Sequence, residues 1–250
     1  MRIAVYQGPS PAGAMAAGWA TLDRALGAAG AAGADVLVLP ELFLPGYNHP
    51  GQDDIALSVV DWHALLTPLV RAAGCALVLG LPERDGDTLF NSALAIGPGG
   101  DLLACHRKVQ LYGPRERALF TPGAGFADFM LAGCRVGLMI CYDVEFAPHV
   151  AALAARGVEV VLVPTANMVP FAHVPHHTVP AMAANNGLAI AYANWCGAEG
   201  ELTYTGGSLI AGPHGEVLAQ AGAGQVLLIA DLPARDPARL STLSTDFRML

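Results

Sequence analysis

Residues 34–41, ADVLVLPE, return in similar form at residues 158–165, VEVVLVPT. Each copy is a short run of aliphatic residues that ends at a proline, which is typical of a buried strand. A second pair follows in the same order and at similar spacing: SALAIGPGGDLLA at 92–104 resembles SLIAGPHGEVLA at 208–219. Two such pairs in register predict a chain built from two related halves.

Helical patterns accompany these strands in both halves. One apolar helical face begins near residue 15, and two further patterns lie near 60–73, which contains Pro68, and near 176–187. The Gly-Pro-Gly-Gly and Gly-Pro-His-Gly segments are strong turn signals between strands. Because strands covered by helices occur in both halves, we expect two sheets packed face to face with helices outside. No linker interrupts the chain, so we expect a single domain over residues 1–250. The residues of the first helical face are Met15, Trp19, Leu22 and Leu26.

Composition narrows the class of protein. The 250 residues are 54% hydrophobic and 14% charged, which is enough apolar material for a sizeable core. The net charge of −8 argues against a nucleic-acid partner, because phosphate binding needs a basic face. No apolar stretch is long enough to cross a bilayer, so we expect no membrane partner. The five cysteines lack a CxxC spacing, which favours free thiols and a cytoplasmic location.

Three chemically different side chains follow apolar runs. Glu41 follows DVLVLP, Lys108 follows LLACHR, and Cys141 follows RVGLMI. Taken singly, each has an ordinary interpretation, and a lone cysteine is most often a small core residue. In α/β sheets, however, functional groups gather beyond the carboxyl ends of strands. The coincidence of the three predicts a catalytic site.

Longer segments around these residues resemble a known family. The segments at 37–48, 106–123 and 136–148 resemble the three signature segments of the nitrilase superfamily, the carbon–nitrogen hydrolases. Those at 162–170 and 192–201 resemble its short-chain aliphatic amidase and omega-amidase branch. The resemblance implies a four-layer αββα sandwich of two pseudo-repeated halves. It also implies a homodimer or larger homo-oligomer, and chemistry without a metal or organic cofactor.

The resemblance also implies the catalytic residues. The family's Glu, Lys and Cys match Glu41, Lys108 and Cys141, and its second glutamate matches Glu116. In such a set, a cysteine attacks the amide carbon, a carboxylate carries protons, and an ammonium stabilises the oxyanion. The backbone N–H of Tyr142 is a natural second oxyanion donor. We expect the substrate pocket to include Tyr142, Asn167 and Trp195, because they lie in loops after predicted strands.

The predicted activity is hydrolysis of a small aliphatic or amino-acid primary carboxamide to the acid and ammonia, through a cysteine thioester. A nitrilase or an N-carbamoyl hydrolase would use the same residues, and a non-catalytic binding protein on the same fold is the alternative from another class. Pro180, Met182 and Asn185 replace the Arg, Arg and Glu expected in this branch, which affects helix geometry more than catalysis. The HVPHH cluster at 173–177 fits no zinc spacing, so no metal site is predicted.

Overall fold

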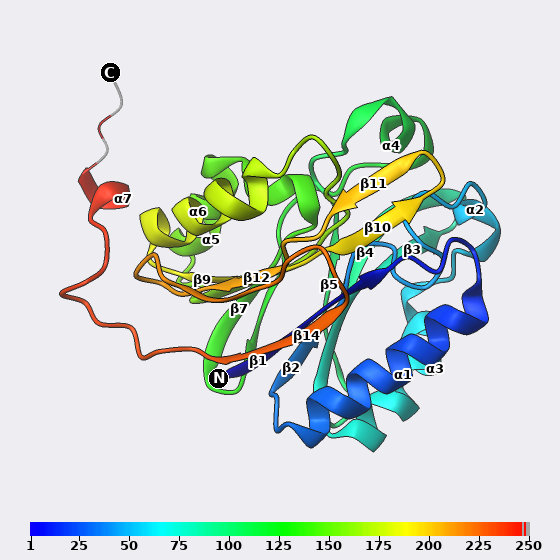
Figure 1. Ribbon diagram of the computed structural model, residues 1–250, viewed down its shortest axis with the longest axis horizontal. Coiled ribbons are helices and arrows are strands. Elements are labelled where there is room, and N and C mark those ends of the chain that lie inside the picture. The colour runs from blue at the N-terminus through cyan, green and yellow to red at the C-terminus, as the bar shows by residue number, and fades with distance from the viewer. Residues whose placement is uncertain (247, 249–250) are drawn as a thin grey trace.

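The computed structural model describes residues 1–246 and residue 248 (Figure 1). The first half of the chain contains β1 (Arg2–Pro9), α1 (Met15–Ala31), β2 (Val36–Val38), α2 (Gln52–Ile55), α3 (Val59–Ala73), β3 (Ala76–Asp85), β4 (Thr88–Ile96) and β5 (Leu102–Arg107). A connecting segment then holds α4 (Gly113–Leu119) and β6 (Asp128–Leu131).

The second half repeats this order with additions near its end. It contains β7 (Cys134–Leu138), the 3₁₀ helix η1 (Cys141–Glu145), α5 (Ala147–Ala155), β8 (Val160–Pro164), the π-helical η2 (Val174–Thr178), α6 (Val179–Asn186) and β9 (Ala189–Ala193). The chain continues through β10 (Trp195–Glu199), β11 (Leu202–Thr205), β12 (Leu209–Ala211), β13 (Val217–Gln220), β14 (Val226–Asp231) and α7 (Leu243–Asp246).

The strands of the described residues form two sheets. One has the order β11-β10-β1-β2-β3-β4-β5, with β14 also paired to β1, and the other has the order β13-β12-β9-β8-β7-β6. The two repeated segments occupy matching places: β2 lies between its parallel neighbours β1 and β3, and β8 between β7 and β9. The two Gly-Pro turns join the antiparallel hairpins β4–β5 and β12–β13. The two halves that the sequence repeat predicts therefore also have matching strand arrangements.

Packing of the sheets creates the four layers. Strand residues such as Val5, Val38, Leu138 and Leu162 form the core between the sheets. The opposite face of the first sheet packs on α1 and α3, and that of the second sheet on α5 and α6 (Figure 1). The predicted αββα sandwich is confirmed. The single-domain prediction includes residues 247, 249 and 250, which lie outside the described residues.

Three local features differ from the sequence pattern or refine it. Helix α3 runs through Pro68 without a break, after an N-cap in which the Ser58 hydroxyl accepts from the Asp61 N–H. Helix α6 forms despite Pro180, which lies in its first turn, where a missing N–H costs little. Trp195, expected in a loop, begins strand β10, because residues 195–199 pair with β1 and β11. Within the described residues, no helix combines the length and apolar character that a membrane crossing requires.

Candidate active site

The catalytic candidates come from the ends of strands in both sheets. Glu41 lies in a turn after β2, Lys108 comes directly after β5, and Cys141 opens η1 just beyond β7. The Glu41 N–H donates to the carbonyl of Thr165, which follows β8, so this contact joins the two sheets at the site. A Cβ added at Gly80 of β3 would lie 2.6 Å from Cα of Glu41, so only glycine lets β3 pass so close to this turn.

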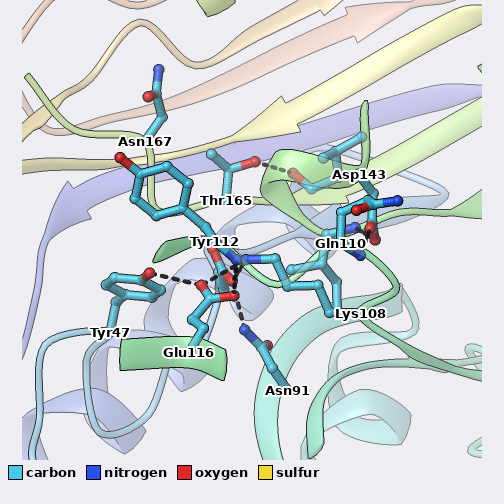
Figure 2. Close-up of polar contacts among 12 residues, drawn as sticks. Tyr47, Asn91, Lys108, Gln110, Tyr112, Glu116, Asp143, Thr165 and Asn167 are labelled. Carbon is cyan, nitrogen blue, oxygen red and sulfur yellow. Dashed lines mark hydrogen bonds and ion pairs between the residues drawn. The ribbon is translucent and has the colours of Figure 1, made fainter. Parts of the chain in front are cut away.

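Lys108 lies between two carboxylates (Figure 2). Its Nζ donates to Oε1 of Glu41 at 2.6 Å and to Oε1 of Glu116 at 2.8 Å. Glu116, on α4, is held in turn by the Tyr47 hydroxyl at 2.7 Å and by the Tyr112 N–H at 2.8 Å. Glu116 therefore fixes the lysine and joins it to two tyrosines that line the pocket.

The two carboxylate oxygens of Glu41 have different surroundings. Oε1 accepts from Lys108 and, at 2.6 Å, from the Asn91 amide on β4. Oε2 is buried, and no donor in the described part of the chain reaches it. The backbone carbonyl of Glu41 accepts from the indole N–H of Trp195 at 3.0 Å. The residue is thus held at one oxygen and at its backbone, while the second oxygen is available to accept a proton.

Cys141 has a backbone φ of +46°, which lies in the left-handed region that non-glycine residues rarely adopt. Strained turns of this kind concentrate at functional sites. Asp143 secures the turn, because its Oδ2 accepts from the Ile140 N–H at 3.0 Å. Its Oδ1 accepts from the backbone N–H groups of Val109 and Gln110, which directly follow Lys108. Asp143 therefore joins the segment of the nucleophile candidate to that of the lysine.

Burial and charge determine the protonation of these groups. Burial, together with the negative charge of Glu116, raises the pKa of Glu41 to about 7, although Lys108 opposes the shift. Burial lowers the pKa of Lys108, but the carboxylates of Glu116 and Glu41 outweigh it and hold the pKa well above its ordinary value. For Cys141, burial and Glu41 outweigh the opposing effect of Lys108, so the thiol pKa lies well above its ordinary value. The net shift therefore favours the thiol over the thiolate.

A pocket of about 210 Å³ opens over Cys141. This volume is below the usual range for drug-sized ligands, so it suits a small substrate. Tyr142 and Asn167, both expected here, line it. The Asn167 amide donates to the carbonyl of Phe171 at 3.0 Å, which orients its side chain at the wall. The other lining residues are Tyr47, Tyr112, Glu145, Ala166, Met168, Phe171 and His173.

Trp195 does not contact this pocket. It is fully buried at the start of β10, stacks on Phe43 with ring centroids 5.1 Å apart, and lines a separate hollow beside α1. Trp195 follows β9 as expected, but the expectation that it lies in a loop and lines the pocket is wrong, because it begins β10. Its contact with the site is the hydrogen bond to the Glu41 backbone. Of the HVPHH histidines, His173 reaches the pocket wall. In the described part of the chain, no cluster of three or more His, Cys, Asp or Glu could hold a metal ion.

Sequence reasoning missed several residues of the site. Asn91 had a visible signal, as a polar residue within the apolar strand TLFNSALAI. Tyr47 lies in the segment 37–48, which resembles a family signature, and Glu145 stands four residues after Cys141. Tyr112 lies in the segment 106–123, which also resembles a family signature, but Phe171 gave no signal, because its edge-to-face contact with Tyr112 depends on how distant loops pack.

The chain is similar to known hydrolases over most of its length. A family model described as carbon-nitrogen hydrolase matches residues 2–239. The chain is 37% identical over 201 residues to an (R)-stereoselective amidase from a Pseudomonas species, covering 79% of this chain and 73% of that protein. It is also 37% identical over 195 residues to a protein from Pyrococcus abyssi named nitrilase, covering 76% and 72%.

A solved structure agrees with these relatives. The NitN amidase from Nesterenkonia sp. AN1 matches with a TM-score of 0.89 and 39% identity, covering 99% of this chain and 96% of that one. Mutants of that amidase have been solved in complex with butyramide and with the acetamide moiety of fluoroacetamide added covalently at the active-site cysteine.

Proposed function

The chain belongs to the carbon–nitrogen hydrolase family and is an amidase, and we propose that it hydrolyses small aliphatic or amino-acid primary carboxamides through a thioester on Cys141. The observation that carries this proposal is the position of Glu41. One of its oxygens is held by Lys108 and Asn91, and the other has no donor among the described residues. Glu41 is therefore oriented as a general base beside a thiol in a small pocket.

Acylation begins with a proton transfer. Because the Cys141 thiol is protonated, Oε2 of Glu41 takes the proton as sulfur attacks the amide carbon. A Glu41 carboxyl with a pKa of about 7 is matched to this task near neutral pH. The Lys108 ammonium and the Tyr142 N–H stabilise the oxyanion of the tetrahedral adduct. Glu41 then returns the proton to the amide nitrogen, and the C–N bond breaks to release ammonia.

Deacylation uses the same groups in reverse. Glu41 takes a proton from a water molecule, whose oxygen attacks the thioester carbon. The C–S bond breaks, the acid leaves, and Glu41 gives the proton back to the Cys141 sulfur. Glu116 moves no proton in this scheme. It positions Lys108, to which it is bonded at 2.8 Å, and keeps the ammonium charged.

A nitrilase activity is the second candidate, because the Pyrococcus abyssi relative bears that name. Two features support the amide. A mutant of the similar Nesterenkonia amidase was solved in complex with butyramide, which is an amide. An N-carbamoyl amino acid carries a carboxylate, yet no lysine or arginine occurs among the described residues that line the pocket. A nitrile and a carbamoyl compound should therefore be poorer substrates.

An ammonia-release assay tests the proposal. Butyramide, butyronitrile and an N-carbamoyl amino acid are compared by kcat/KM with the purified protein. We expect butyramide to lead by more than tenfold. A lead of that size by the nitrile or the carbamoyl compound would reject the substrate class while leaving the cysteine chemistry intact. Absence of ammonia from every compound would reject the proposed function.

We also propose a homodimer or larger homo-oligomer, as members of this family commonly form, and a cytoplasmic location. All five cysteines are free, which supports a reducing compartment. Light scattering of the purified protein tests the first proposal, and a monomeric mass would reject it. Fractionation of the source cells tests the second.

A further inference from the structure

Glu145 is a carboxylate in the pocket that takes no part in the proposed mechanism. It ends η1, the 3₁₀ helix that begins with Cys141, and it lines the pocket over the thiol. Among the residues that the structure describes, no donor or cation lies within hydrogen-bond or ion-pair distance of its side chain. The other acidic side chains of the site, Glu41 and Glu116, are both bonded to Lys108. Glu145 is thus partly buried with no cation bonded to it, and the Lys108 ammonium acts on it only from a longer distance.

The charge of the pocket wall follows from this arrangement. Of the described lining residues, Glu145 is the one carboxylate, and none is lysine or arginine. Burial raises the pKa of Glu145 to about 7, although the charge of Lys108 opposes the shift, so ionising Glu145 without a bonded partner is costly. A cation that enters the pocket would remove this cost and strengthen its own binding.

The rings around Glu145 suit the same kind of ligand. Tyr112, Tyr142 and Phe171 line the pocket, and Tyr112 makes edge contacts with the other two rings at centroid distances of 5.4 and 6.0 Å. The faces of aromatic rings attract an ammonium group. An ammonium group at this wall would meet both the rings and the Glu145 carboxylate, whereas a carboxylate at the same place would be repelled by Glu145.

We propose that Glu145 binds an ammonium group on the substrate, so that the preferred substrates are short primary amides that carry an amine. Cys141 and Glu145 lie at opposite ends of η1 and line the same pocket, so their side chains are separated along the pocket wall. This separation favours an amine a few bonds away from the carboxamide, as in β- and γ-amino amides. The inference rests on the proposed amidase function and names its substrate class.

Matched pairs of substrates test it. In 3-aminopropanamide an ammonium group replaces the terminal methyl of butyramide, and 4-aminobutanamide is related to pentanamide in the same way. We expect the wild type to favour the amino member by about tenfold or more in kcat/KM, mainly through KM. Glu145→Gln should reduce this ratio at least tenfold, and Glu145→Asp should retain part of it. Succinamate, which carries a carboxylate, should be the poorest wild-type substrate and should improve in Glu145→Gln.

Glu201→Gln is the control, because it removes an exposed carboxylate in the β10–β11 turn, outside the pocket. It should keep the wild-type ratio. Equal losses on both members of a pair in Glu145→Gln, or a wild type that prefers the neutral amide, would overturn the inference while the amidase function stands. If the wild type released ammonia from neither member, the proposed function itself would fail.

Discussion

The Lys108 ammonium lies 2.6 Å from Oε1 of Glu41, and both side chains are fully buried. A buried ion pair of this kind is costly to form, because each charge loses its hydration. A hydrophobic pair of similar volume would often be as stable, so the pair is poorly explained by stability alone. The proposed mechanism explains it, since an ammonium at this place would meet the oxyanion that forms above Cys141.

Replacement of Lys108 should therefore affect the chemical step. Lys108→Met keeps most of the side-chain length but removes the charge. We expect the acylation rate to fall by about 10²-fold or more, the usual value of one oxyanion donor. Single-turnover measurements with butyramide check this. A loss confined to substrate binding, with acylation unchanged, would contradict the electrostatic role.

Cys141→Ala should abolish turnover and leave the fold intact, because it removes the nucleophilic sulfur from a side chain that is small and half-buried. Circular dichroism and ammonia release check the two parts. Cys134→Ala is the matched control, since Cys134 begins β7 and packs between the sheets, outside the pocket. Near-wild-type activity in Cys141→Ala would remove the basis of the mechanism.

Asp143 should matter for both stability and rate. Its two oxygens accept from the N–H groups of Ile140, Val109 and Gln110 and contact His106 at 3.0 Å. In Asp143→Asn the amide nitrogen cannot accept, so buried donors lose their partner at about 1–3 kcal/mol. We expect a lower Tm together with a lower kcat.

Asp87→Asn provides the comparison for this variant, because Asp87 is exposed in the turn between β3 and β4. Its Tm and kcat should match the wild type. An Asp143→Asn enzyme with wild-type values of both would show that Asp143 does not hold the two segments together.

The pH dependence should report Glu41. A general base acts in its ionised form, and burial raises the pKa of Glu41 from 4.5 to about 7. The value of kcat/KM for butyramide, a neutral amide, should therefore fall as pH drops through 7, by about tenfold per unit below it. Glu145 has a pKa of about 7 as well. If Glu41 is the base, the fall in kcat/KM below pH 7 should persist in Glu145→Gln, which lacks the second carboxyl with this pKa. A fall that begins only near pH 4.5 in both proteins would argue against Glu41 as the base.

The sequence predicted the fold and the main residues of the site because short local patterns of residues indicate both. The repeated proline-bounded strands indicated two halves, and Glu41, Lys108 and Cys141 each follow a recognisable apolar run. The supporting contacts were not predictable in this way. Asn91 and Glu41 meet across 50 positions of the chain, and no local pattern encodes such a pairing.

Trp195 shows where local reading fails. The segment after Asn194 contains glycine and glutamate and reads as a polar loop. It becomes strand β10 because Gly8 and Pro9 of β1 pair with its first residues and β11 pairs along its length. These partners carry Trp195 into the core, where it supports Glu41 from behind and does not face the pocket.

The most direct test of the account is to isolate the acyl-enzyme. Wild-type protein is mixed with butyramide, quenched in acid during turnover, digested and examined by mass spectrometry, with hydroxylamine added to a parallel reaction. The account predicts one butyryl group on the peptide that contains Cys141, and butyryl hydroxamate when hydroxylamine competes with water. Butyrylation of another residue, or hydroxamate formation that persists in Cys141→Ala, would contradict it.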